Sequence, residues 1–186
     1  MRKIIAIIFI AALLLGCKTV SAPKRAINDS GMVYAMVYDY ENSPVSGAAI
    51  SIDGKKYIES DLQGRFILEF KQKGEHTIKV EKPNYEVIEE IFTYDPMNVL
   101  YFKMINSSQL LTQAEESLDQ NAYKDAEAFV GRALALEPNR QDILYLQCVI
   151  LYFQNRKAEA KIILEGLQNR GINGEHIEGL LKRLSE

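Results

Sequence analysis

Histidine, cysteine and tryptophan are scarce in this sequence, and their scarcity excludes several kinds of site. The 186 residues include two His, two Cys and no Trp. Two cysteines are too few for the disulfide framework of a small secreted domain. Neither His76 nor His176 is followed by a glutamate three residues later, as the zinc site of a metallocarboxypeptidase requires. The composition therefore supplies little for metal or thiol chemistry, and we predict no bound metal.

Motifs of common catalytic sites are also missing. The sequence contains no G-x-S-x-G turn, no Walker loop and no glycine-rich dinucleotide fingerprint. Aspartate and glutamate are abundant, which leaves the carboxylate pair of a glycosidase open, but their spacing is typical of solvated helix faces and strand edges. We predict that the protein is not an enzyme and uses no cofactor.

Positive charge is concentrated at the amino terminus. The formal net charge is −3, and it becomes −5 if Arg2 and Lys3 are removed with a targeting segment. After residue 30, acidic residues outnumber basic ones. A nucleic-acid-binding surface needs clustered Lys and Arg, so we predict that nucleic acid is not a partner.

The first seventeen residues have the pattern of a lipoprotein signal. A short basic start is followed by an unbroken apolar run from Ile4 to Leu15, which is too short to span a bilayer but typical of a signal peptide. The run ends in the string Leu-Leu-Gly-Cys at residues 14–17. This string resembles the bacterial lipobox. The resemblance implies that residues 1–16 are removed and that Cys17 carries lipid, whose two or three acyl chains would anchor the protein durably.

This resemblance predicts a location and a membrane partner. We expect a lipid-anchored protein of the cell membrane or the outer membrane, facing the periplasm or the exterior. Lys18 stands where an aspartate would act as a sorting signal, which favours the outer membrane in a cell that has one. Residues 17–30, with the lipidated Cys17 at their start, are mostly polar and are interpreted as a tether.

Residues 31–105 alternate between apolar and polar side chains with a period of two. The alternation is clear at 33–38, 48–52, 66–70 and 76–80, and turn-forming residues separate these stretches. The dipeptide Asp53-Gly54 is a strong hairpin signal. Several short strands at this spacing predict an antiparallel β-sandwich.

The same region carries a longer motif, made up of Val37, Asp39, Pro44, Gly47, Ala48, Ile50, Ser60, Asp61, Gly64, Arg65, Phe66, Gly74, His76, Ile78, Val80 and Tyr85. This motif resembles that of the carboxypeptidase regulatory-like family, whose members have a transthyretin-like or CnaB-like fold. The resemblance implies a prealbumin-like sandwich. It says little about activity, because such modules serve as spacers, stalks or accessories that bind sugar or protein.

Three tyrosines are candidates for a second kind of binding. Tyr34, Tyr38 and Tyr40 are expected to share the strand face opposite Val33 and Val37. They could form an aromatic platform for a glycan, or they could pack against the tether or the neighbouring domain. Both interpretations stay open at this point.

The apolar period changes from 2 to 3.6 near Ser107, which predicts helices from there to residue 186. The segment Asn106-Ser107-Ser108 provides side chains that cap a helix. Shifting the chain by 34 residues superimposes matching positions, and 34 is the period of the tetratricopeptide repeat family, which these helices resemble. The matched pairs are Leu110 with Leu144, Ala114 with Cys148, Asn121 with Asn155, Ala126 with Ala160, and Val130 with Leu164.

The resemblance implies two repeats, followed by a capping helix over 175–184. An array this short usually needs help to bury its core, so we expect support from the sandwich or from self-association. Ile105 is followed almost at once by the cap at Ser107, which favours a fixed arrangement of the two domains. Cys148 occupies a small-residue position and is expected to be a buried, inert thiol.

The leading functional hypothesis is a non-catalytic adaptor of the cell envelope that binds a protein partner through its helices. The alternative is an accessory lipoprotein that binds glycan or peptidoglycan through its sandwich. In the repeat family, first-helix residues usually line the binding groove. By that resemblance the candidate partner-binding residues are Gln113, Glu116, Gln120, Tyr145, Gln147 and Gln154.

Overall fold

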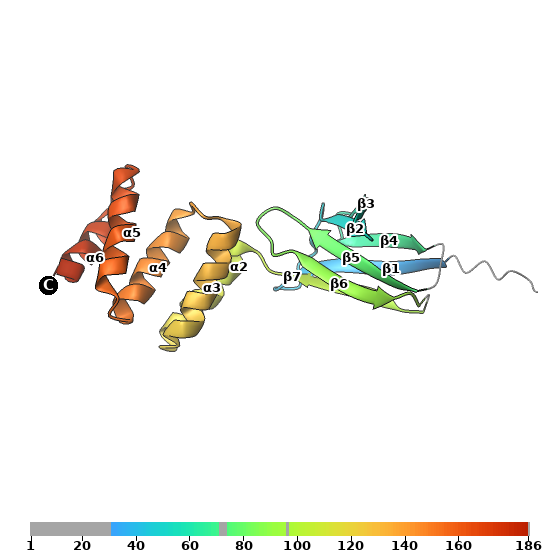
Figure 1. The fold of residues 1–186 in the computed structure, drawn as a ribbon, viewed down its shortest axis with the longest axis horizontal. Coiled ribbons are helices and arrows are strands. Elements are labelled where there is room, and N and C mark those ends of the chain that lie inside the picture. The colour runs from blue at the N-terminus through green and yellow to red at the C-terminus, as the bar shows by residue number, and fades with distance from the viewer. Residues whose placement is uncertain (1–30, 71–73, 96, 186) are drawn as a thin grey trace, which may run out of the picture.

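The structure is a computed structural model that describes residues 31–70, 74–95 and 97–185. In this part of the chain seven strands come first and five helices follow (Figure 1). The strands form one end of an elongated molecule and the helices form the other. The predicted α+β architecture with two domains is confirmed. The predicted signal peptide 1–16, the tether 17–30 and Cys17 lie outside the described residues.

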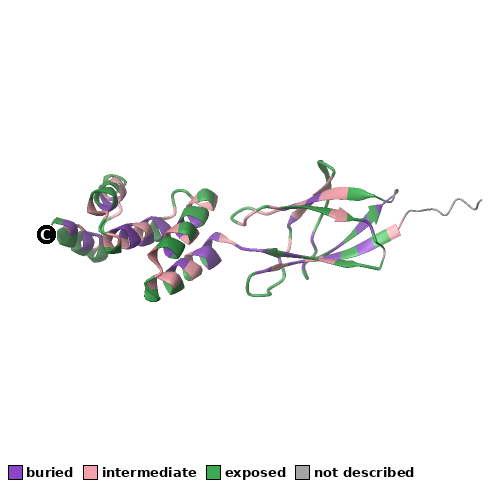
Figure 2. Ribbon diagram, turned by 60° about the horizontal axis from the view of Figure 1, so that its bottom comes forward, coloured by how far each residue is buried: buried purple, intermediate pink, exposed green. Residues whose placement is uncertain are grey.

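The strands form two packed sheets. One sheet has the order β4-β1-β7 and the other has the order β3-β2-β5-β6. Purple segments in Figure 2 mark the buried residues between them. The strands are β1 (Gly31–Asp39), β2 (Ala49–Ile52), β3 (Lys55–Glu59), β4 (Arg65–Phe70), β5 (Glu75–Glu81), β6 (Ile88–Thr93) and β7 (Val99–Met104).

Alternation along the strands builds the core of the sandwich. Every second residue of β1 points inward, so Val33, Ala35 and Val37 are almost fully buried. Ile50 and Ile78 are fully buried in the four-stranded sheet and belong to the same core. This is the face that the period of two predicts.

The hairpin predicted at Asp53-Gly54 is present. It joins β2 to β3, and the two residues have φ angles of 50° and 75°. Positive φ at both central residues is the requirement of a type I′ turn, which matches the twist of the flanking strands. The Asp53 carboxylate also accepts hydrogen bonds from the Thr77 backbone N–H at 2.9 Å and contacts Nδ1 of His76 at 2.8 Å, tying the turn to β5.

One strand pairing differs from the predicted antiparallel pattern. β7 runs parallel to β1, whereas the other pairings described are antiparallel. The chain passes from β6 in one sheet to β7 in the other and joins the free edge of β1, in the same direction as β1. Alternation of side chains is the same in both kinds of ladder, so the sequence pattern does not reveal the direction of a partner strand.

The five helices stack as successive hairpins. Asn106 caps the first of them, because its side chain accepts a hydrogen bond from the Gln109 N–H at 2.8 Å and its own N–H donates to the Gln109 side chain at 3.3 Å. The cap predicted from the sequence is confirmed. The helices are α2 (Ser107–Asp119), α3 (Tyr123–Leu136), α4 (Gln141–Phe153), α5 (Lys157–Asn169) and α6 (Glu175–Ser185).

The 34-residue register is visible in the turns between helices. Asn121 and Asn155 have φ angles of 58° and 61° and follow the ends of α2 and α4. Asparagine tolerates this left-handed conformation, which lets the next N–H bond back to the helix. The N–H groups of Ala122 and Arg156 make these bonds, to Ser117 and Leu151. Apart from these two asparagines, the other eight residues that the 34-residue shift pairs are buried.

Helix α4 belongs to two cores, which explains its continuous apolar sequence. Ile143 and Ile150 pack toward α2 and α3, whereas Cys148 and Leu151 pack toward α5 and α6. Burial raises the pKa of the Cys148 thiol to about 12, so the reactive thiolate is rare at neutral pH. In the described part of the chain, no helix combines the length and apolar character that a bilayer span requires.

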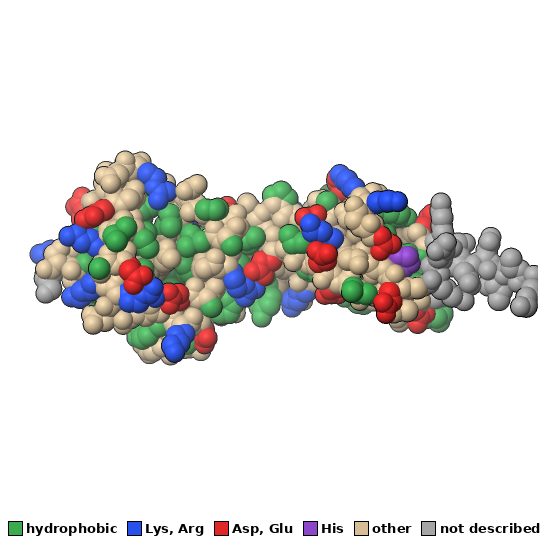
Figure 3. Space-filling model, in the orientation of Figure 1, with side chains coloured by type: hydrophobic (Ala, Val, Ile, Leu, Met, Phe, Trp, Pro, Cys, Tyr) green, Lys and Arg blue, Asp and Glu red, His purple; other side chains and the backbone are tan. Residues whose placement is uncertain are grey.

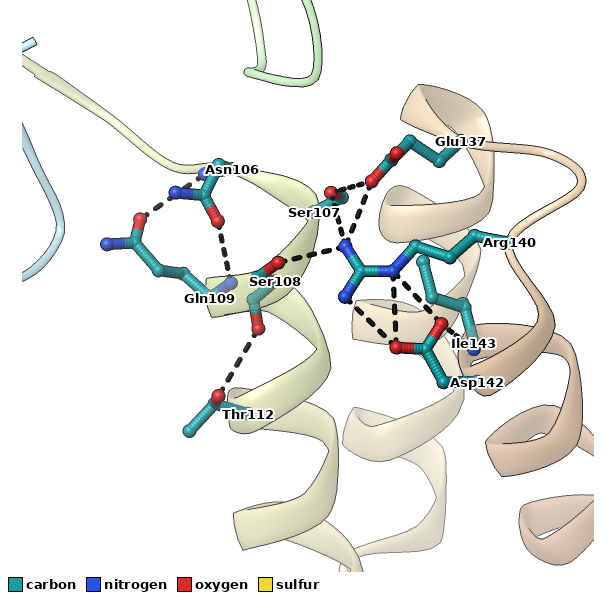
Figure 4. A network of polar contacts seen from close by, with 9 residues as sticks. All are labelled: Asn106, Ser107, Ser108, Gln109, Thr112, Glu137, Arg140, Asp142 and Ile143. Atoms are coloured by element: carbon teal, nitrogen blue, oxygen red, sulfur yellow. Dashed lines mark hydrogen bonds and ion pairs between the residues drawn. The ribbon is translucent and has the colours of Figure 1, made fainter.

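Arg140 connects the first helix to the turn between α3 and α4 (Figure 4). One guanidinium nitrogen donates to the hydroxyls of Ser107 and Ser108, at 3.0 and 2.9 Å, and to the Glu137 carboxylate at 3.0 Å. The other two nitrogens donate to Asp142 at 3.0 to 3.2 Å. Ser107 also donates to Glu137. One side chain thus joins residues from α2, the turn and the start of α4.

Candidate partner-binding groove

A groove lies between α4 and α6, with a volume of about 610 Å³. Figure 3 shows hydrophobic side chains gathered over the helices on one face of the molecule, with charged side chains among them. The floor of the groove is apolar and aromatic, and its two ends carry charge. Its lining residues are Tyr145, Val149, Tyr152 and Phe153 of α4, and Glu175, His176, Gly179, Leu180 and Arg183 of α6.

The aromatic side chains of the groove support one another. The Tyr145 ring meets the His176 ring edge to face, with 4.9 Å between centroids and an interplanar angle of 88°. Phe153 contacts Tyr152 on its own helix and stacks on Tyr123 of α3 at 5.7 Å. Phe153 is nevertheless 52% exposed. An exposed aromatic ring held in place by neighbouring rings loses little entropy on binding, which is the character of an interface anchor.

A missing side chain on α6 keeps the groove open. Gly179 lines the groove, and a Cβ atom placed there would meet no other atom within 4 Å. Glycine weakens a helix interior by roughly 0.5–1 kcal/mol relative to alanine. Local helix stability therefore does not explain the residue, and the absence of a side chain there leaves space in the groove.

Opposite charges stand at the two ends of the groove. Glu175 begins α6 and Arg183 lies in its last turn, positions that the helix dipole favours for each sign. Eight residues of helix separate them, which is about 12 Å. Among the described residues, neither side chain takes part in an ion pair. Both charges are thus available to a ligand that lies along the groove.

The six predicted partner-binding residues lie in different places. Tyr145 lines the groove. Gln147 is two positions further along α4, which is about 200° around the helix, and it does not line the groove. Gln154 is engaged in a structural network, where it donates to Glu127 at 2.8 Å and accepts from Arg156 at 2.8 Å.

The other three predicted residues belong to α2. Gln113 lines a separate hollow beside the sandwich and donates to Glu116 at 3.0 Å. Glu116 and Gln120 are exposed, and Gln120 is the C-cap of α2. The structure therefore brings one of the six into the groove, and the role of the others in binding stays a prediction.

Sequence reasoning missed most of the groove. Val149, Tyr152 and Phe153 follow Tyr145 at intervals of four, seven and eight, which is one helix face. That spacing is the sequence pattern from which the groove face of α4 could have been predicted. It was hidden because α4 is apolar on nearly every side, so its groove face resembles its two core faces.

A second hollow lies over the outer face of the three-stranded sheet, with a volume of about 710 Å³. Tyr34 of β1 lies between Ile67 of β4 and Val99 of β7 in the strand register. Tyr34 is 59% exposed, and Tyr101 of β7 is 68% exposed. Arg65 is also part of its lining. Tyr101 thus joins Tyr34 in an exposed aromatic pair that sequence reasoning did not identify.

The other two tyrosines of the predicted platform lie elsewhere. Tyr38 is half-buried, and its hydroxyl donates to the sulfur of Met36 at 3.5 Å. Tyr40 follows the end of β1 and lines the hollow beside Gln113, with the Lys103 ammonium 4.9 Å from its ring centroid. Of the three, Tyr34 is the one that lines the hollow on the sheet.

Comparison with known proteins supports the helical half of this description. The sequence profile of the tetratricopeptide repeat family matches residues 117–184, fewer than half of the chain. The match covers most of the helical array and includes both helices that form the groove. No match is found among curated proteins.

Similarities to solved structures are weak. The major pilin subunit BcpA of Bacillus cereus aligns with a TM-score of 0.33 and 16% identity, over 41% of this chain and 28% of the pilin. A 3-chlorocatechol 1,2-dioxygenase from Rhodococcus opacus 1CP aligns with a TM-score of 0.32 and 11% identity, over 42% of this chain and 59% of the enzyme. This chain therefore spans about a quarter of the pilin's length. At these TM-scores the likenesses carry no argument about function.

Proposed function

We propose that the protein is a non-catalytic adaptor that binds a segment of a partner protein in the groove between α4 and α6. The observation that carries this proposal is an open aromatic groove with a carboxylate at one end and a guanidinium at the other, neither of them in an ion pair within the described part of the chain. The match of the helical region to tetratricopeptide repeats supports a protein partner.

The lining of the groove indicates the chemistry of this segment. Aromatic and aliphatic anchors would fill the space over Val149, Phe153 and Gly179, since fully desolvated apolar contacts carry most binding energy. A basic residue would lie near Glu175 and an acidic residue near Arg183. These charges would set the direction of the segment more than its affinity.

We further propose that lipid on Cys17 anchors the protein to a membrane of the cell envelope. The apolar run and the Leu-Leu-Gly-Cys string support this part of the proposal. The start of β1 lies at the end of the molecule opposite the helices (Figure 1). An anchor before β1 would therefore leave the groove far from the membrane, with the sandwich as the spacer.

Replacing Cys17 with Ser is expected to move the protein from the membrane fraction to the soluble fraction, because no acyl chain can be attached. The measurement is fractionation of cells followed by mass spectrometry of the amino-terminal peptide. An unmodified Cys17 in the wild-type protein would refute the anchor, without affecting the proposal for the groove.

Filling the groove is expected to release the protein partner. Gly179→Leu would add a side chain to the lining of the groove, and its Cβ atom would meet no other atom within 4 Å. The measurement is reversible crosslinking in cells with the native protein as bait, followed by mass spectrometry. We expect one or a few partners to be reduced by about tenfold or more, as for loss of roughly 1.4 kcal/mol of binding energy.

The matched control is Gly131→Leu. Gly131 is exposed on α3, and a Cβ atom there also meets nothing within 4 Å. Both variants exchange a helical glycine for a good helix former, so they differ mainly in position. Equal recovery of every partner with the two variants would exclude the groove as the binding site.

The second candidate function is binding of a glycan by the outer face of the three-stranded sheet. The exposed pair Tyr34 and Tyr101 favours it, since flat aromatic rings beside polar groups suit a sugar ring. If the crosslinked material is peptidoglycan, and if the double substitution Tyr34→Ala and Tyr101→Ala abolishes its recovery, function belongs to the sandwich. Recovery that survives both substitutions would exclude this surface.

A further inference from the structure

The two domains are joined by main-chain hydrogen bonds as well as by the chain itself. The loop between β5 and β6 lies beside the segment that leaves β7. The Glu86 N–H donates to the Ile105 carbonyl at 3.0 Å, and the Ser107 N–H donates to the Asn84 carbonyl at 3.0 Å. Tyr85 and Asn106 form a β-bridge between these two bonds. The crossing from sandwich to helices is thus a short paired ribbon rather than a single free strand.

A bidentate ion pair lies across the same junction. Nε and one terminal nitrogen of Arg132, on α3, donate to the two carboxylate oxygens of Glu86, each at 2.7 Å. Arg132 also lies over the ring of Phe129, 5.5 Å from its centroid. Two parallel bonds from a planar guanidinium fix orientation as well as distance. The pair therefore constrains the direction of α3 relative to the sandwich.

An apolar contact lies beneath the pair. Ile105 follows β7 but is 9% exposed and belongs to the core of α2, α3 and α4. The sandwich thereby contributes a residue to the first repeat, at the end of the array that has no preceding repeat to cover it. This is the support that an array of two repeats was expected to need.

We propose that Glu86 and Arg132 form a latch that closes the junction, so that the sandwich and the helices move as one rigid body. The latch joins Glu86, in the loop between β5 and β6, to Arg132 on α3. Without it, the chain could bend as a hinge at residues 105–107. With the latch closed, the groove between α4 and α6 has a fixed direction relative to the start of β1. This proposal does not depend on what the groove binds.

Hydrogen exchange of the two amides that cross the junction tests the latch in the intact chain. In Arg132→Gln, the amides of Glu86 and Ser107 are expected to exchange about twofold to fivefold faster than in the wild-type protein, as for loss of a partly exposed ion pair. The amides of β1 are expected to keep their rates. Combining Glu86→Arg with Arg132→Glu reverses the pair and is expected to restore slow exchange.

The matched control is Arg170→Gln. Arg170 is also an exposed arginine, at the C-cap of α5, but its bonds go to Gly166 and Asn139 within the helical domain. This substitution should leave the exchange rates of the Glu86 and Ser107 amides unchanged. Three results would overturn the latch. The first is unchanged exchange at Glu86 and Ser107 in Arg132→Gln, and the second is exchange in the wild-type protein as fast as in an unstructured peptide. The third is faster exchange in Arg132→Gln that the reversed pair does not restore, because the ion pair would then not be the closing element.

Discussion

Gly64→Ala is expected to destabilise the sandwich by roughly 2–5 kcal/mol. Gly64 has a φ angle of 71°, a conformation that costs an alanine about 1–2 kcal/mol. A Cβ atom there would also lie 2.3 Å from the Val37 carbonyl oxygen and 3.2 Å from the Val45 nitrogen. These are main-chain atoms, so the clash cannot be relieved by rotating a side chain.

The surrounding hydrogen bonds make the clash harder to relieve. The Val37 N–H donates to the Gly64 carbonyl at 2.8 Å, and the Val45 N–H donates to the Val37 carbonyl at 3.0 Å. Moving Val37 away from a new Cβ would strain both bonds and shift β1, the central strand of its sheet. We expect the substitution to disturb the packing and pairing of the whole three-stranded sheet.

Gly47→Ala separates the two contributions. Gly47 has a φ angle of 68°, close to that of Gly64, but a Cβ atom at Gly47 meets nothing within 4 Å. It should therefore cost only the conformational part, about 1–2 kcal/mol. The measurement is the free energy of unfolding of each variant from denaturant titration, followed by near-ultraviolet circular dichroism of the tyrosines. Equal losses at the two positions would show that the close approach at Gly64 contributes nothing.

Local features of the fold could be predicted because each depends on residues close together in sequence. The turn at Asp53-Gly54 needs two adjacent residues, and the cap at Asn106 needs a partner three positions later. The 34-residue register depends on repetition, so buried alanines and left-handed asparagines recur at the expected positions. Periods of 2 and 3.6 also locate the change of domain type at Ser107.

Features that join distant segments could not be predicted in the same way. The parallel neighbour of β1 is β7, more than sixty residues away, and alternation carries no information about strand direction. Tyr101 joins Tyr34 only because of that pairing. The groove likewise depends on how α6 packs against α4, and Gly179 has no distinguishing feature in the sequence until the space above it is known.

Arg140→Ala is expected to destabilise the helical domain by about 2–3 kcal/mol at neutral pH, measured as the free energy of unfolding. The substitution removes hydrogen bonds to Ser107, Ser108, Glu137 and Asp142 together, and the two carboxylates lose their cationic partner. The Arg140 side chain is 27% exposed, so solvent screens the ion pairs only in part. Arg140→Lys cannot bridge all four partners, so it should restore only a minor share of the lost free energy of unfolding.

The loss of unfolding free energy in Arg140→Ala should depend on pH, in a direction set by the carboxylates of Glu137 and Asp142. Bonds from the Ser107 hydroxyl and Arg140 hold the pKa of Glu137 below its usual 4.5. Burial alone would raise the pKa of Asp142, but Arg140 lowers it below its usual 3.8. A folded-state pKa below the unfolded value means that folding releases protons in this range. The stabilisation is therefore complete above about pH 5 and is lost as pH falls through the folded values.

Removing Arg140 removes one of the two causes that lower the pKa of Glu137 and the main cause that lowers the pKa of Asp142, so the variant should show weaker acid dependence than the wild-type protein. The difference in unfolding free energy between them should be largest near pH 7 and should shrink as the pH falls through the lowered pKa values of the two carboxylates, where both become protonated. Arg170→Ala is the control, since its partners Gly166 and Asn139 are neutral and do not titrate. A difference that stays constant from pH 7 to pH 3 would mean that Arg140 acts through its bonds to the two serines and through packing, and that the ion pairs contribute little.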